Sequence, residues 1–264
     1  MITTPLTGDL IHGALELERT DVGLRVHRLP AWARAQAADA QLTMVESQPA
    51  GVRVVVTTTA RHLELRALAT RYTYRGAPAR PDGVFDVVVD GALVAQGSLD
   101  GATLVTMDPR TGGVETTPGE VRAVVAGNLP EGEKRVEIWL PHQETLELVE
   151  LRSDAPVQGV PAPGRRWVHH GSSISQGSNA THPTGTWAAV AAMTGGVDLL
   201  NLGFGGSAMV DPFVARTIRD LPADLLSVSF GINVVNADVM RRRAFRPAVH
   251  GFLDTVREGH PETP

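Results

Sequence analysis

One serine lies where a strand-like segment gives way to a helix, a position that could expose it for chemistry. Ser173 stands in segment 171–174 (Gly-Ser-Ser-Ile), directly after the strand-like run 167–170. Open α/β sheets bind their ligands at the carboxyl ends of the strands. A serine hydroxyl can attack an ester carbonyl when a base removes its proton. Ser173 is therefore a candidate nucleophile, and helix N-capping is the structural alternative, since serine is a preferred N-cap residue.

Two further loops follow strand-like runs in the same way. The first is 201–206 (Asn-Leu-Gly-Phe-Gly-Gly) and the second is 231–233 (Gly-Ile-Asn). A glycine N–H such as that of Gly206, and a side-chain amide such as that of Asn233, can both donate to a developing oxyanion. The structural alternatives are an ordinary strand-to-helix turn and an asparagine bonded to its own backbone. Together the three loops predict an exposed nucleophile with two oxyanion-stabilising loops.

Other site motifs match these loops less well. Ser175 stands where the nucleophile elbow Gly-x-Ser-x-Gly has its second glycine, and no lysine follows Gly177 as it would in a P-loop. Segment 203–208 matches the dinucleotide fingerprint, but Asp224 precedes the next strand instead of ending it. Nucleotide binding is therefore a third hypothesis. No histidine pair has metalloprotease spacing, so we expect no metal and no cofactor.

The elements that must position these loops lie in the second of two parts of the chain. Residues 1–153 hold short alternating segments separated by Gly, Pro and Asp turns, which predicts an all-β sandwich or jelly roll. Segment 154–164 is rich in Pro and Gly and is typical of a linker. Strand-like and helical segments then alternate over 165–264, which predicts an α/β domain with a parallel sheet.

Three strands and three longer helices are expected in this second part. The strands are 167–170, 197–201 and 225–230, and the helices lie near 186–194, near 211–220 and from about 246 onward. Pro247 is suited to the first turn of the last helix. Three strands make a thin sheet for such a fold.

The composition excludes several classes of function. The chain has 264 residues, a net charge of −5 and no cysteine. Disulfides, thiolate catalysis and cysteine-bound zinc are therefore excluded, and there is no basic footprint for nucleic acid or an acidic membrane. No apolar run reaches the roughly 18–20 residues of a membrane span. Segment 1–15 lacks the basic start and apolar core of a secretion signal, so we expect a cytoplasmic protein.

Taken in this order, the three loops resemble the SGNH (GDSL-type) hydrolase family. Its blocks Gly-Asp-Ser-Ile/Leu, Asn-x-Gly-x-x-Gly and Gly-x-Asn-Asp correspond to segments 171–174, 201–206 and 231–234. The first half of the chain resembles the jelly-roll domain that precedes some members. Those members include carbohydrate esterases and an acyltransferase of tetracycline biosynthesis. Segment 13–30 contributes to this second likeness.

The resemblance implies a serine esterase or acyltransferase that forms an acyl-serine intermediate. Ser173 would be the nucleophile, and its backbone N–H, the N–H of Gly206 and the side chain of Asn233 would bind the oxyanion. The substrate would be a small-molecule or carbohydrate acyl ester, and no cofactor would be needed. The alternative is a protein that binds carbohydrate or another ligand and has a non-catalytic SGNH-like half.

The chain also departs from the family pattern. Ser172 and Val234 stand where the family has aspartates, neither of which has a core catalytic role. The family's Asp-x-x-His block, which supplies the base and its partner, has no counterpart after Asn233, since Asp254 is followed three residues later by Arg257. We therefore expect a truncated α/β domain with little activity, because a serine without its base loses most of its catalytic advantage.

Overall fold

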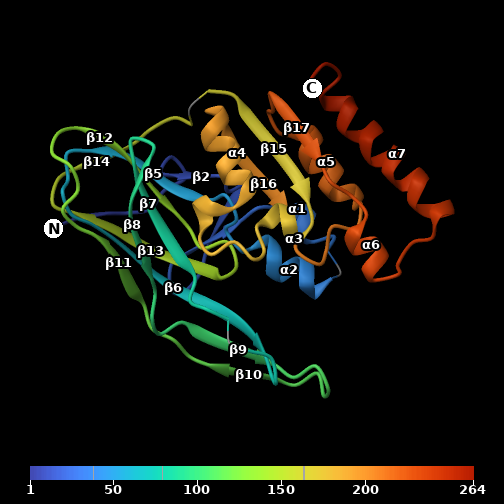
Figure 1. Ribbon diagram of the computed structural model, residues 1–264, viewed down its shortest axis with the longest axis horizontal. Coiled ribbons are helices and arrows are strands. Elements are labelled where there is room, and N and C mark those ends of the chain that lie inside the picture. The colour runs from blue at the N-terminus through green and yellow to red at the C-terminus, as the bar shows by residue number, and fades with distance from the viewer. Residues whose placement is uncertain (38, 79, 163) are drawn as a thin grey trace.

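The computed structural model, which describes residues 1–37, 39–78, 80–162 and 164–264, has a β-rich part beside an α/β part (Figure 1). The β-rich part comes first along the chain, and the α/β part follows it. This architecture confirms the fold class predicted from the sequence.

Two sheets form the β-rich part. One contains β1 (Ile2–Thr4), β3 (Glu16–Arg19), β4 (Leu24–His27), β6 (Leu63–Tyr74), β9 (Thr103–Met107), β10 (Val114–Thr117), β11 (Arg122–Ala126) and β13 (Thr145–Ser153). The other contains β2 (Ile11–His12), β5 (Arg53–Thr58), β7 (Val84–Val89), β8 (Ala92–Ser98), β12 (Lys134–Trp139) and β14 (Val157–Gly159). The described pairs are antiparallel except β6 with β9, which run parallel.

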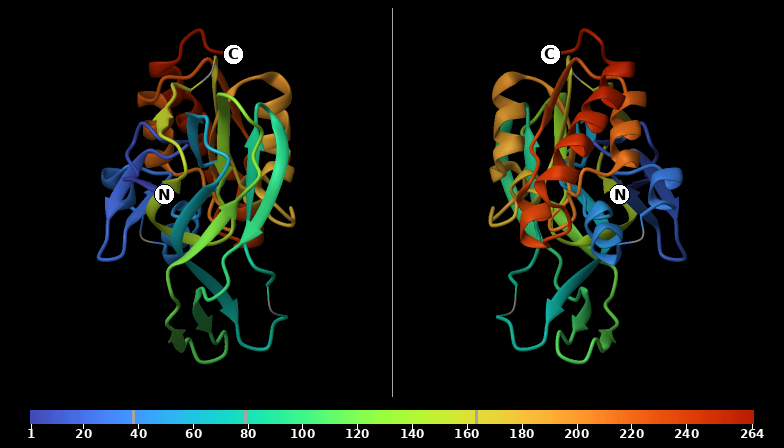
Figure 2. Two further views of the ribbon diagram at one scale, coloured as in Figure 1. Left: turned by 90° about the vertical axis from the view of Figure 1, so that its left-hand side faces the viewer. Right: turned by 90° about the vertical axis from the view of Figure 1, so that its right-hand side faces the viewer.

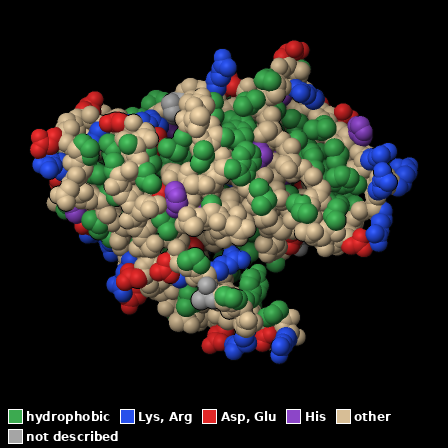
Figure 3. Space-filling model, in the orientation of Figure 1, with side chains coloured by type: hydrophobic (Ala, Val, Ile, Leu, Met, Phe, Trp, Pro, Cys, Tyr) green, Lys and Arg blue, Asp and Glu red, His purple; other side chains and the backbone are tan. Residues whose placement is uncertain are grey.

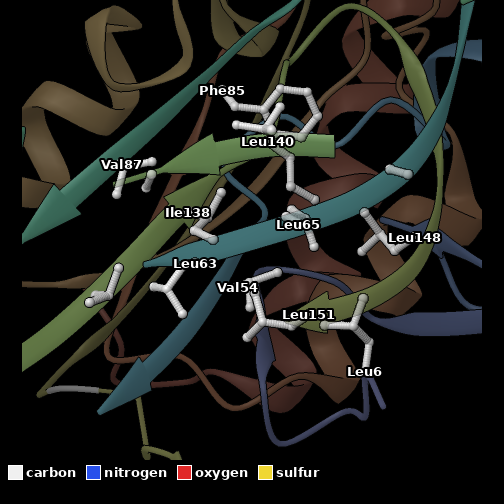
Figure 4. Packing of buried hydrophobic residues seen from close by; sticks show 14 of the residues in the cluster. Leu6, Val54, Leu63, Leu65, Phe85, Val87, Ile138, Leu140, Leu148 and Leu151 are labelled. Atoms are coloured by element: carbon white, nitrogen blue, oxygen red, sulfur yellow. The ribbon is translucent and has the colours of Figure 1, made fainter. Parts of the chain in front are cut away.

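The apolar core of this part lies between the two sheets. Side chains of β6 alternate between buried and half-buried, so that Leu63 and Leu65 point inward. Figure 4 shows them beside Val54 and Ile138 of the opposite sheet. Alternation with a period of two places every second side chain on the buried face, which is the basis of the sequence prediction.

One strand lies inside the segment that the sequence predicts as a linker. Val157–Gly159 forms β14 and pairs antiparallel with β5. β14 is at the edge of its sheet. Edge positions tolerate neighbouring proline, because only one side of the strand must donate hydrogen bonds. Part of the predicted linker therefore belongs to the sandwich.

The α/β part is built on a parallel sheet of three strands. β15 (Arg166–Gly171) lies between β16 (Asp198–Gly203) and β17 (Leu225–Val228). Gly171 and Gly203 are register partners, so the two strands end side by side. The loops that carry the first two predicted blocks therefore leave the sheet at the same edge.

Helices cover both faces of this sheet, which gives three layers (Figure 2). Trp167 and Leu199 pack against α4 (Trp187–Gly195) on one face. Val168 and Leu200 pack on the other face in a core shared with α5 (Pro212–Asp220) and α7 (Arg242–Gly259). Neighbouring residues of a strand point to opposite faces, so the buried runs in these strands serve both helical layers.

Two predicted elements differ from those observed. The last helix, α7, begins at Arg242, so Pro247 lies inside it and not in its first turn. Figure 3 shows the arginine side chains at the start of this helix on the surface. The third strand, β17, ends at Val228 and is half exposed, with Leu225 39% exposed, because it stands at the edge of the sheet.

Two short helices stand where β structure is expected throughout. They are α1 (Ala31–Arg34) and α2 (Ala40–Glu46), and the side chain of Asp39 caps α2 by accepting from two backbone N–H groups. Leu29, Leu42 and Val45 pack in the core of the α/β part, not in the sandwich. Residues early in the chain therefore help to build the domain that carries the predicted site.

No helix in the described ranges is long and apolar enough to cross a membrane.

Candidate active site

Ser173 lies at the first position of a one-turn helix. β15 ends at Gly171, and α3 (Ser173–Gln176) begins two residues later with Ser172 as its N-cap. The Ser172 side chain makes no capping hydrogen bond. The Ser173 hydroxyl also has no hydrogen-bond partner among the residues that the structure describes, although its backbone C=O accepts from Gly177. Ser173 is therefore not the N-cap residue, and the Ser172 side chain does not cap the helix.

The second loop passes directly beside Ser173. A Cβ added at Gly205 would lie 3.5 Å from the Cβ of Ser173 and 2.9 Å from Oε1 of Gln176. Gly206 has a φ of +81°, a left-handed conformation that L side chains rarely adopt. Ser173 and Gly206 line the same cavity of about 200 Å³. The two predicted site residues are thus brought together.

Asn233 is joined to the second loop, but it is not among the residues that line this cavity. It lies in α6 (Ile232–Asn236), is 6% exposed, and accepts the backbone N–H of Ala208 at 3.1 Å through Oδ1. An N–H can only donate, so the group that faces Ala208 must be the oxygen of the Asn233 amide. The NH₂ group of the same amide is then free to donate to another acceptor. The structure therefore anchors Asn233 to the loop that carries Gly206.

Gln176 and Gln41 hold the second loop in place. The Gly205 N–H donates to Oε1 of Gln176 at 2.7 Å, and Nε2 of Gln41 donates to the Gly205 C=O at 2.9 Å. Nε2 of Gln176 in turn donates to Oε1 of Gln48 at 2.5 Å. The Gly205 N–H is thus engaged, which disfavours the hypothesis that segment 203–208 binds a pyrophosphate.

Asn201, the first residue of the second block, ties the two loops together. Its Nδ2 donates to the Ser175 C=O at 2.8 Å, and its Oδ1 accepts the Gly203 N–H at 2.7 Å. The side chain is 1% exposed. A buried asparagine with both ends satisfied holds α3 against the end of β16, since an unsatisfied buried amide is costly.

The histidines in the described ranges are engaged away from Ser173. Most of them form hydrogen bonds with carboxylates, hydroxyls, amides or carbonyls of other residues. The histidines with such bonds are His12, His27, His62, His142, His169, His170, His182 and His260. His250 is exposed on α7. None of them donates to or accepts from the Ser173 hydroxyl in the described structure, so the serine has no base in contact.

One serine–histidine pair does exist, but it is buried. Nε2 of His169 lies 2.8 Å from Oγ of Ser175, and each residue is 3% exposed. Burial lowers the pKa of His169 to about 4, so the ring is neutral at pH 7. A nucleophile must be reachable by its substrate, which makes Ser175–His169 a structural pair.

The walls of the cavity come from both parts of the chain. Tyr72 and Tyr74 at the end of β6, with Met44 of α2, line it together with Ser173. The same three side chains also line an adjoining cavity of about 630 Å³. A substrate at Ser173 would therefore touch residues from the β-rich part.

The roles of Gln41, Gln48 and Gln176 could not be predicted from the sequence. Each acts through a partner far away along the chain, as the separation of 164 positions between Gln41 and Gly205 illustrates. Glutamine also has no local spacing that marks such a role. The described residues contain no group of three or more His, Cys, Asp or Glu that could hold a metal ion.

Two family models match the chain. The model described as "SsfX3, N-terminal domain" matches residues 10–149, and the model described as "GDSL-like Lipase/Acylhydrolase family" matches residues 165–264. These matches confirm the resemblance to GDSL-type hydrolases with a preceding β domain. No curated protein matches the chain significantly.

Solved structures with a similar fold include a salicylyl-acyltransferase, SsfX3, from a tetracycline biosynthetic pathway. It is 29% identical with a TM-score of 0.85, over 100% of this chain and 71% of that one. A putative GDSL-like lipase from Bacteroides ovatus is 21% identical with a TM-score of 0.70, over 97% of this chain and 70% of that one. An acetyl xylan esterase from Butyrivibrio proteoclasticus is 14% identical with a TM-score of 0.59, over 100% and 80%. The last two likenesses concern the fold alone.

Proposed function

Because the chain belongs to the SsfX3 N-terminal domain family and carries a GDSL-like lipase/acylhydrolase domain, we propose that it forms an acyl-serine intermediate from an acyl ester. The acyl group then passes to water or to an alcohol acceptor. The proposed substrate is a small-molecule or carbohydrate ester. The observation that carries the proposal is the unbonded hydroxyl of Ser173 in one cavity with the backbone of Gly206.

In the proposed reaction, Oγ of Ser173 attacks the ester carbonyl carbon and its proton passes to a base. The backbone N–H groups of Ser173 and Gly206 and Nδ2 of Asn233 donate to the oxyanion. Collapse of this intermediate breaks the bond to the leaving oxygen, which takes up a proton. Loss of one such donor typically lowers the rate by about 10²–10³-fold.

The base is the limiting component of this proposal. No described imidazole contacts the Ser173 hydroxyl, so we expect slow acylation by the chain alone. Added imidazole can accept the proton instead and should accelerate acylation, since general base catalysis contributes about 10²–10⁴-fold.

The test is the release of p-nitrophenolate from p-nitrophenyl acetate as the imidazole concentration is raised. Wild type is compared with Ser173→Ala, and Ser178→Ala is the matched control because Ser178 lines the same cavity. Imidazole itself attacks the ester, and the Ser173→Ala reaction measures that background. We expect wild type and Ser178→Ala to exceed Ser173→Ala by a margin that grows with imidazole. Equal rates for all three proteins would remove Ser173 as the nucleophile.

A binding protein with a non-catalytic α/β part is the second candidate. The observation that favours it is the lack of a described base beside Ser173. Failure to detect any reaction dependent on Ser173, at every imidazole concentration, would support this second candidate over the enzyme.

A further inference from the structure

Arg28 is a fully buried cation that the proposed mechanism does not use. It follows β4, is 0% exposed, and its guanidinium donates to four backbone carbonyls. The acceptors are Gln48 at 2.6 Å, Asn201 at 2.9 Å, Gly203 at 2.7 Å, and Val45. A charge is rarely buried without such compensation, so this arrangement implies a specific role.

These four carbonyls belong to two segments that meet at the candidate site. Asn201 and Gly203 lie in the last three residues of β16, and Gly205 and Gly206 follow in the loop after Phe204. Val45 lies in the last turn of α2, the helix that carries Gln41, and Gln48 follows the end of this helix by two residues. Since Gln41 itself binds the Gly205 carbonyl, Arg28 holds both the second loop and the helix that supports it.

One peptide unit links Arg28 to the strand before the nucleophile. The Gly203 C=O accepts from Arg28, and the N–H of the same peptide, on Phe204, donates to the Gly171 C=O at 2.7 Å. The guanidinium also lies 5.1 Å from the centre of the Phe204 ring. Hydrogen bonds in such a chain polarise and strengthen one another.

We infer that Arg28 is a positioning residue that fixes the direction of the Gly206 N–H relative to Ser173. The inference rests on the proposed function and adds to it a residue that does not touch the substrate. Lysine cannot replace this residue, because its compact ammonium group lacks the planar fork that reaches carbonyls on several sides. Without the hydrogen bond from Arg28 to the Gly203 C=O, the loop would still fold. It would, however, hold the Gly206 N–H in more than one orientation.

The test compares Arg28→Lys with Arg53→Lys. Arg53 is also a buried arginine, 3% exposed, and it binds Asp198 at 2.6 Å, at the opposite end of β16. The first readout is the acylation of Ser173 by p-nitrophenyl acetate with imidazole, analysed as maximal rate and half-saturating ester concentration. We expect Arg28→Lys to lower the maximal rate at least tenfold and to change the half-saturating concentration by less than twofold. Arg53→Lys, corrected for its folded fraction, should match wild type.

The second readout does not depend on activity. Amide hydrogen exchange of segment 200–207 should be at least tenfold faster in Arg28→Lys than in wild type, and unchanged in Arg53→Lys. If wild type shows no acylation dependent on Ser173, the proposed function fails, and the exchange result alone still decides the role of Arg28. Equal behaviour of the two variants in the exchange experiment would overturn the inference.

Arg28→Gln, which keeps an amide donor without the charge, replaces Arg28→Lys if the latter does not fold. Failure of both to fold, while Arg53→Lys folds, would show that Arg28 is a requirement for folding and would also overturn the inference.

Discussion

At the scale of single residues, the proposed oxyanion donors are held in place before a substrate arrives. Asn233 illustrates this arrangement, because its Oδ1 is already occupied by the N–H of Ala208 at 3.1 Å. The bond leaves the NH₂ group oriented and available. Donors fixed in this way stabilise charge without reorganising during the reaction.

Asn233→Asp tests the two groups of this side chain, the oxygen and the NH₂ donor, separately. The aspartate keeps an oxygen for the Ala208 N–H but has no donor for an oxyanion, and it places a negative charge near the reaction. We expect acylation assisted by imidazole to fall by about 10²–10³-fold. The melting temperature should fall, because a carboxylate replaces a buried neutral amide even though the Ala208 N–H remains satisfied. An unchanged acylation rate in a folded variant would exclude Asn233 from the oxyanion site.

At the scale of elements, β15 carries two neutral histidines in its buried centre. Burial lowers the pKa of both His169 and His170 to about 4. His170 also lies between aromatic rings, with Phe252 stacked on it at 5.7 Å. The folded protein must therefore lose stability when low pH protonates these two buried imidazoles.

The sign of this effect follows from the two states of each histidine. In the unfolded chain the pKa returns to its ordinary value of 6.5, above the folded value of about 4. Between these values the unfolded chain binds more protons, so stability is fully present above pH 6.5 and falls as the pH decreases toward 4. Over this range the free energy of unfolding should fall by roughly 1.4 kcal/mol per pH unit for each histidine. This value is the expected slope of stability against pH.

Urea unfolding at several pH values between 7 and 4 measures this slope. In His170→Asn, Nδ2 of the asparagine can replace the ring nitrogen that faces the Leu202 carbonyl. This variant should reduce the slope of stability against pH by about the contribution of one histidine. The exposed His250→Asn is the matched control and should leave the slope unchanged. A slope that His170→Asn does not alter would contradict the assignment of a neutral, buried ring.

Elements with a strong local pattern could be predicted, and those without one could not. The strands that precede Ser173 and Gly206 were recognisable because apolar runs end at glycine-containing loops. The one-turn α1 and the two-turn α2 are too short to show a helical stripe. The start of α7 was misplaced because Pro247 is tolerated inside that helix, although proline favours first turns.

At the scale of the whole molecule, the two parts depend on each other. Leu29, Leu42 and Val45 come from the first part of the sequence and complete the core of the α/β part. Gln48 and Arg28, from the same region, hold the loops of the site. These contacts join residues far apart in the sequence, which explains why no local pattern predicted them.

This dependence predicts how fragments of the chain behave. Residues 165–264 alone would expose the apolar surface that α1 and α2 cover, and the buried end of β16 would lose Arg28. We expect this fragment to show no cooperative thermal transition by circular dichroism and to associate in size-exclusion chromatography. Residues 1–164 contain the complete sandwich core and should retain β structure. A monomeric, cooperatively folding 165–264 fragment would refute this prediction.

We propose that the cavity beside Gly206 makes Ser173 reactive toward an ester. The most direct measurement is peptide mass spectrometry of the chain after brief exposure to p-nitrophenyl acetate with imidazole and an acid quench. We predict a single acetyl group on the peptide that contains Ser173, located on that residue and missing in Ser173→Ala, with Ser178 unmodified. Acetyl groups distributed over other residues, with Ser173 unmodified, would show that Ser173 is not the reactive serine.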